Sequence, residues 1–191
     1  MARGIKDQVA VIGMGCTKFG ERWDCNLEDL MIEAIKECSE DSGIELKDID
    51  AFWFGTFSSS TIGALPFSMG LKTQYKPVTR VENMCATGSD CFRNACYAVA
   101  SGAYDVVMAI GAEKLKDCGY SGLETPMIHS DRTTPEPSAP ARFALLAPAY
   151  ANKFNLEMKH LKEVMGKIAW KNHFNGALNP KAQYRSEVPL E

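Results

Sequence analysis

The feature that most constrains the fold is the alternation of short apolar runs with segments of helical periodicity in the first part of the chain. Strands are expected at Gln8–Gly13, Ile49–Phe54, Val78–Val81 and Asp105–Gly111, and helices at Leu27–Ser42, Thr61–Leu71 and Cys85–Ala100. Asn26 and Gly43 are suitable caps for the first of these helices. Strand–helix alternation implies right-handed crossovers and a parallel sheet, with functional groups at the carboxyl ends of the strands. The sequence therefore predicts an α/β fold.

The composition changes after about Lys116. The segment Asp117–Ala141 is rich in Gly, Ser, Thr and Pro, and its prolines, including Pro140, are expected to prevent regular helix. Loops this long are usually functional or disordered. Two helices are expected to follow, at Arg142–Asn155 and Lys159–Asn175. We therefore predict an α/β domain over residues 1–116 and a mostly helical subdomain over residues 117–191.

Composition excludes several classes of function. The net charge is −3, which gives no reason to expect nucleic-acid binding, and no apolar run approaches the ~20 residues of a membrane helix. Seven cysteines, an odd number, suit a reducing compartment better than a disulfide framework. The three histidines are scattered and there is no Cys-x-x-Cys, so no metal site is expected. These observations predict a cytoplasmic globular protein.

Cys85 is the first candidate functional residue. It follows the predicted strand Val78–Val81 and lies near the first turn of a helix, where unpaired N–H groups and the helix dipole favour a thiolate. Its small neighbours, including Ala86 and Gly88, leave room for a bulky substrate. The alternative is that Cys85 is a buried small hydrophobic residue, the commonest fate of a free cysteine. Spacing alone favours that alternative.

Several ordered motifs change this balance. Asn83-Met-Cys85-Ala-Thr-Gly88-Ser resembles the nucleophile motif of the thiolases, and Val9–Gly20 is similar to their opening strand and turn. Ser101–Lys114 is similar to the helix end and strand that follow the nucleophile helix, and Lys171–Gln183 resembles a signature of the sterol-carrier-type and archaeal branch. The resemblance covers almost the whole chain. It implies the N-terminal half of an α-β-α-β-α sandwich with an inserted loop subdomain.

The resemblance also implies an activity. In an acetyl-CoA C-acyltransferase of lipid metabolism, Cys85 would attack a 3-oxoacyl-CoA and hold the acyl group as a thioester, with coenzyme A as co-substrate and no covalently bound cofactor. The Cys85 backbone N–H would contribute to an oxyanion hole, supported by Asn83 and Gly88. Candidates for an acyl pocket are Met127, His129 and Phe143. Glu113, at the end of an apolar strand, either orients the site or faces solvent.

The remaining thiolase motifs are not found in the 191 residues. There is no Gly-His-Pro, and no Cys-x-Gly follows Cys85, so the catalytic histidine and second cysteine are expected on a C-terminal half. By resemblance we expect a homodimer or larger assembly, that complementary half, and a small OB-fold and zinc-ribbon partner. The sequence is compatible with acetoacetyl-CoA as the substrate and equally with a bulkier aromatic or steroid 3-oxoacyl-CoA. A non-catalytic component of a thiolase-like or aldolase complex and a ketoacyl synthase are the alternatives, although the retained cysteine argues against an aldolase.

Overall fold

The computed structural model describes residues 4–57, 63–117 and 139–190. They form two compact units. The first contains residues 4–17 and 21–117, and the second contains residues 18–20 and 139–190.

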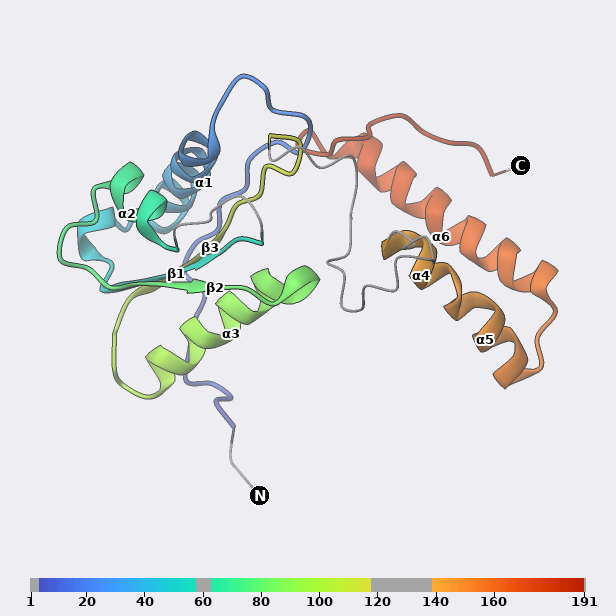
Figure 1. Cartoon of the computed structure of the whole chain (residues 1–191), viewed down its shortest axis with the longest axis horizontal. Coiled ribbons are helices and arrows are strands. Elements are labelled where there is room, and N and C mark those ends of the chain that lie inside the picture. The colour runs from blue at the N-terminus through green and yellow to red at the C-terminus, as the bar shows by residue number, and fades with distance from the viewer. Residues whose placement is uncertain (1–3, 58–62, 118–138, 191) are drawn as a thin grey trace, which may run out of the picture. The chain divides into compact units, whose positions relative to one another are not determined.

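A parallel sheet forms the centre of the first unit (Figure 1). Its strands are β1 (Ala51–Gly55), β2 (Val78–Val81) and β3 (Val107–Gly111), in the order β2-β1-β3. Both pairings are parallel, so the predicted parallel sheet is confirmed. A central strand is covered on both faces, which explains why β1 reads as a continuous apolar run.

Helices cover both faces of this sheet. Helices α1 (Leu27–Ser42) and α2 (Leu65–Leu71) lie on one face and α3 (Thr87–Ala100) lies on the other (Figure 1). The core between α1, α2 and the sheet contains Met31, Ile35, Ile49, Phe52, Phe54, Phe67 and Ile110. Residues from α1, α2, β1 and β3 are buried together in this core, and the predicted α/β fold is confirmed.

The first helix has the bounds that its capping residues predict. The Asn26 side chain accepts a hydrogen bond from the Asp29 N–H at 2.8 Å, and the Asp29 carboxylate accepts one from the Asn26 N–H at 3.0 Å. At the other end Gly43 adopts φ 71° and its N–H donates to the Ser39 carbonyl at 2.9 Å. A glycine adopts this left-handed conformation without the steric cost of a Cβ. Helix α2 is shorter than the expected Thr61–Leu71 and has Pro66 in its first turn. A short connection joins α2 to β2.

The expected strand at Gln8–Gly13 is wrong. These residues form no strand, and the backbone beyond them bonds to α1 instead: the Met14 N–H donates to Asp41 and the Cys16 N–H donates to Glu37, each at 2.9 Å. A Cβ built on Gly15 would lie 2.0 Å from the Ala34 carbonyl oxygen of α1. The glycines therefore allow a close approach to the helix, and carboxylates take the hydrogen bonds that a neighbouring strand would otherwise accept.

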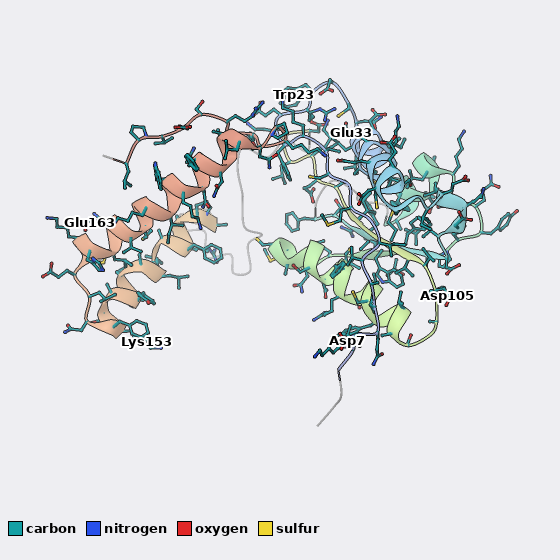
Figure 2. All side chains as sticks on the ribbon, turned by 180° about the vertical axis from the view of Figure 1, so that it is seen from behind. Asp7, Trp23, Glu33, Asp105, Lys153 and Glu163 are labelled. Atoms are coloured by element: carbon teal, nitrogen blue, oxygen red, sulfur yellow. The ribbon has the colours of Figure 1, made fainter. Side chains whose placement is uncertain are left out.

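The second unit is helical. It contains α4 (Ala139–Ala144), α5 (Leu146–Phe154) and α6 (Met158–Leu178). One continuous helix was expected over Arg142–Asn155, but a turn at Leu145 separates α4 from α5. Pro140 lies in the first turn of α4, so the expectation that it prevents helix is wrong, because proline is tolerated there. Helices α5 and α6 pack against each other, and Figure 2 labels Lys153 and Glu163 on them. Most of the predicted irregular segment 117–141 lies outside the described residues.

Two further features concern the described ranges only. None of their helices combines the length and the apolar character that a bilayer crossing requires. In the same ranges, no three or more His, Cys, Asp or Glu side chains come together as a metal ion would need.

Candidate active site

Cys85 lies in a tight turn between β2 and α3. A single 3-10 turn, Met84–Ala86, follows β2 after two residues and leads directly into α3. The Cys85 side chain is exposed there. Cys91, which lies within α3, is buried with only 1% of its surface exposed. The buried-hydrophobe interpretation therefore describes Cys91 and not Cys85.

Burial also changes the chemistry of Cys91. Its thiol lies against the sheet, and desolvation, with a smaller contribution from the Asp90 charge, raises its pKa to about 11. A thiol with such a pKa is protonated at neutral pH, and the thiolate is the nucleophilic form of cysteine. Cys91 is thus a packing residue.

The side chain of Thr87 closes the turn that carries Cys85. Its hydroxyl accepts a hydrogen bond from the Asn83 N–H at 2.8 Å and donates one to the Met84 carbonyl at 2.7 Å. The Ala86 N–H donates to the Asn83 carbonyl at 2.9 Å. Thus Asn83 takes part through its backbone, and its side chain makes no capping bond. The turn is fixed on both sides of Cys85.

Met84 has an unusual backbone conformation immediately before Cys85. Its φ is 47°, in the left-handed region that residues with a Cβ rarely occupy. The Met84 N–H donates to the Glu82 carboxylate at 2.6 Å. Backbone strain of this kind persists only where the surroundings hold it. Here the bonds from Glu82 and Thr87 hold it.

The start of α3 lies close to the carboxyl end of β1. A Cβ built on Gly55 would lie 2.9 Å from the Thr87 Cγ2 and 2.9 Å from the Cys91 Sγ. Only glycine allows this approach without displacing the helix. Gly55 therefore brings the Cys85 turn to the strand end where ligands bind in open parallel sheets.

A second set of bonds fixes the backbone that follows β1. The Glu113 carboxylate accepts hydrogen bonds from the Phe57 N–H at 2.6 Å and from the Thr56 hydroxyl at 3.4 Å. The Arg80 guanidinium donates to the Thr56 and Phe57 carbonyls at 3.2 Å and 3.1 Å. Glu113 is itself exposed, and its carboxylate also anchors the backbone that follows β1, so it meets solvent and can still have an orienting role.

The described residues include two of the other candidates from the sequence, Gly88 and Phe143. Gly88 lies in the first turn of α3, and a Cβ there would meet no atom within 4 Å, so the space beside the turn is open. Phe143 is an exposed residue of α4, in the second unit. Met127 and His129 lie outside the described residues. The acyl pocket built from these three residues stays a prediction.

Sequence patterns assigned no role to three residues of this site, Thr87, Gly55 and Arg80. A Ser or Thr three residues after the start of a tight turn is a known pattern for a side-chain-to-backbone bond, and this could have indicated Thr87. Gly55 ends an apolar strand, where a glycine suggests close approach of another backbone or helix. No comparable signal marks Arg80, because its partners are backbone carbonyls.

The fold is that of a known family. The chain belongs to the thiolase family, since residues 9–191 match the family described as "Thiolase, N-terminal domain". The acetyl-CoA acetyltransferase of Methanothermobacter thermautotrophicus is 35% identical over 96% of this chain and 49% of the relative. Human sterol carrier protein 2 is 30% identical over 96% of this chain and 36% of the relative. The chain thus spans half or less of the length of these curated relatives. The similarity to both of them confirms the expected sterol-carrier-type and archaeal branch of the family.

Solved structures show the same fold. The Ltp2-ChsH2(DUF35) aldolase superposes with a TM-score of 0.71 at 22% identity, over 95% of this chain and 47% of that one. The acetyl-CoA acetyltransferase of Syntrophomonas wolfei superposes with a TM-score of 0.58 at 20% identity, over 94% of this chain and 49% of that one. Both likenesses support the thiolase-like architecture.

Proposed function

We propose that this chain carries the nucleophilic cysteine of a thiolase that cleaves or forms a 3-oxoacyl-CoA. The observation that carries the proposal is the exposed Cys85 in a fixed turn at the start of α3, beside the carboxyl end of the central strand. Two curated relatives from archaea are named acetyl-CoA acetyltransferase, which supports this class of reaction.

In the cleavage direction the Cys85 thiolate attacks the keto carbon of the substrate. The carbon–carbon bond then breaks, its electron pair leaves on the acetyl-CoA fragment as an enolate, and a proton converts that enolate to acetyl-CoA. The acyl group remains on Cys85 as a thioester. The thiol of coenzyme A attacks this thioester and restores the cysteine, so that one difficult displacement becomes two easier ones.

The turn contributes binding of the developing oxyanion. The first N–H groups of a helix have no intrahelical partner and lie at the positive end of the helix dipole. The Cys85 N–H belongs to the turn that opens α3, where such a donor stabilises the oxyanion of acyl transfer. We assign Asn83 and Gly88 supporting roles, Asn83 through its backbone and Gly88 by leaving space for the substrate.

The complete reaction needs further groups. A base that activates Cys85 and an acid–base group at the substrate carbon are proposed to come from a C-terminal thiolase half, and Met127, His129 and Phe143 to line the acyl pocket. A dimer or larger assembly in the cytoplasm, with a small OB-fold and zinc-ribbon partner, belongs to the same proposal. The structurally similar Ltp2-ChsH2(DUF35) aldolase is named as an assembly of two proteins, which supports a partner protein for this chain.

The test is the intact mass of the chain, together with a complementary thiolase half, after incubation with acetoacetyl-CoA or a longer 3-oxoacyl-CoA. A mass gain of one acyl group is expected. It should disappear in Cys85→Ala and persist in Cys16→Ala, which removes another exposed thiol. The absence of any adduct from an assembly that contains both halves would overturn the proposal and favour a structural component. The substrate that labels the chain defines the acyl preference.

A further inference from the structure

Thr87 connects two parts of the site that are distant in the sequence. Its side chain is buried, with 8% of the residue exposed, although the residues on either side of it are exposed. Its hydroxyl bonds to the backbone of Asn83 and Met84, the two residues before Cys85. Its methyl group lies against Gly55, where a Cβ would approach it to 2.9 Å.

The two branches of the side chain therefore have separate tasks. The methyl group fixes the start of α3 against the end of β1, and the hydroxyl fixes the turn relative to that helix. A β-branched side chain has few rotamers, so the positions of the two branches are coupled. No other side chain type offers one hydroxyl and one methyl at this position.

The hydroxyl also balances the unfavourable conformation of Met84. Without it, the Asn83 N–H loses this partner, while the Met84 carbonyl keeps the bond from the Thr87 backbone N–H. One of the restraints on the left-handed φ of Met84 is then removed. A residue with a Cβ then relaxes toward a more populated region of φ and ψ. Since Met84 directly precedes Cys85, that relaxation changes the direction of the thiol.

We infer that Thr87 is the positioning residue of the nucleophile, acting through the backbone of Asn83 and Met84 and not by contact with the reacting atoms. The inference rests on the proposed role of Cys85. It assigns the hydroxyl to the direction of the thiol and the methyl group to the spacing between α3 and β1. These assignments can be separated by substitution.

The experiment compares Thr87→Val, which keeps the shape and removes the hydroxyl, with Thr87→Ser, which keeps the hydroxyl. The probe is iodoacetamide, and peptide mass spectrometry follows the alkylation of Cys85 over a range of pH. Cys16, which is exposed and distant in sequence, is the internal reference. Loss of hydrogen bonds of ordinary strength predicts that Thr87→Val slows Cys85 alkylation about fivefold relative to Cys16 and alters its pH profile. Thr87→Ser should retain the native rate and profile.

An unchanged Cys85 rate and pH profile in folded Thr87→Val would overturn the inference. If that variant does not fold, the amide hydrogen exchange rate of Asn83 in the native chain tests the inference instead. The Asn83 amide should exchange more slowly than an unprotected amide of the same sequence, because its N–H is bonded to Thr87, and unprotected exchange would contradict the assignment. Alkylation needs no acyl-CoA and no second half. Failure of this inference is therefore distinguishable from failure of the acyl-transfer proposal.

Discussion

Arg80 and Glu113 bind the same two residues, Thr56 and Phe57, from opposite sides. Arg80 is on β2 and Glu113 follows β3, while the residues they hold, Thr56 and Phe57, follow the strand between them. The guanidinium binds the carbonyl oxygens and the carboxylate binds the Phe57 N–H. Each charge thus meets the backbone group of complementary polarity. The ends of all three strands are thereby connected next to the cysteine turn.

The first prediction concerns Glu113. Glu113→Ala removes the acceptor of the Phe57 N–H and should lower the free energy of unfolding by about 1 kcal/mol, the usual contribution of one hydrogen bond. Glu113→Gln retains an oxygen acceptor and should lose less. Urea unfolding midpoints measure the difference. Equal losses in the two variants would show that the hydrogen bond is not the source of the effect.

The second prediction uses two glycines that face each other in the sheet. Gly55 of β1 is paired with Gly111 of β3. A Cβ on Gly55 would overlap the side chains of Thr87 and Cys91, whereas one on Gly111 would meet only the Gly55 carbonyl, at 3.6 Å. Gly55→Ala should therefore cost about 1–3 kcal/mol of stability by overpacking, and Gly111→Ala much less. Thermal or urea unfolding of the two variants tests this. Similar stabilities would mean that α3 does not pack as described.

The third prediction is an acid-dependent loss of stability through Asp50. Its carboxylate accepts the N–H groups of Val106 at 2.9 Å and of Asp105 at 3.0 Å, and these bonds lower its pKa. Figure 2 labels Asp105 at the entry to β3. The stabilisation is present above the ordinary carboxyl pKa of about 3.9 and is lost as the pH falls through the lower value of the folded state.

Asp50→Asn should remove this contribution. Its unfolding free energy should depend less steeply on pH below about 4 than that of the native chain. Asp48→Asn, two residues earlier, is the matched control, because it removes a nearby carboxylate and leaves the bonds from Asp50 to the Asp105 and Val106 N–H groups in place. Denaturant titrations at a series of acidic pH values give the slopes, and parallel curves for all three proteins would contradict the assignment.

The fourth prediction concerns alkaline pH and Cys91. The folded-state pKa of about 11 lies above the ordinary thiol value of about 8.5. The unfolded chain therefore releases this proton first, so the stabilisation is complete below a pH of about 8.5 and is lost as the pH rises toward about 11, in total on the order of 3 kcal/mol. Cys91→Ala should show a shallower decrease over this range, whatever its stability at neutral pH. Identical slopes would exclude a buried thiol as the cause.

The sequence predicted the parts of the fold that depend on local rules. Asn26 and Gly43 define both ends of α1 because capping requires particular residue types at the two positions. The apolar run at Phe52 and Phe54 predicted the central strand, since only a strand covered on both faces has such a pattern. Cys85 was placed within one turn of the helix start for the same reason, because strand, turn and helix patterns follow one another directly.

The parts that could not be predicted depend on partners far along the chain. The apolar pattern of Gln8–Gly13 is that of a strand, but Asp41 and Glu37 on α1 take the N–H bonds of the following residues. Likewise, the attachment of Arg80 to the end of β1 depends on tertiary geometry and on no pattern around residue 80. The left-handed Met84 runs against the preference of its side chain, and the bonds around it explain why it is tolerated.

The bonds around the candidate site also differ in how much chain they enclose. Asn83 and Thr87 are four residues apart, whereas Phe57 and Glu113 are 56 apart. Closing the longer loop has the larger entropic cost. Partial opening of the protein should therefore release the Phe57 N–H while the Asn83 N–H stays bonded, with Phe57 exchanging its amide hydrogen first. The turn that carries the thiol is the most local part of the site, and the strand ends beside it depend on the whole sheet.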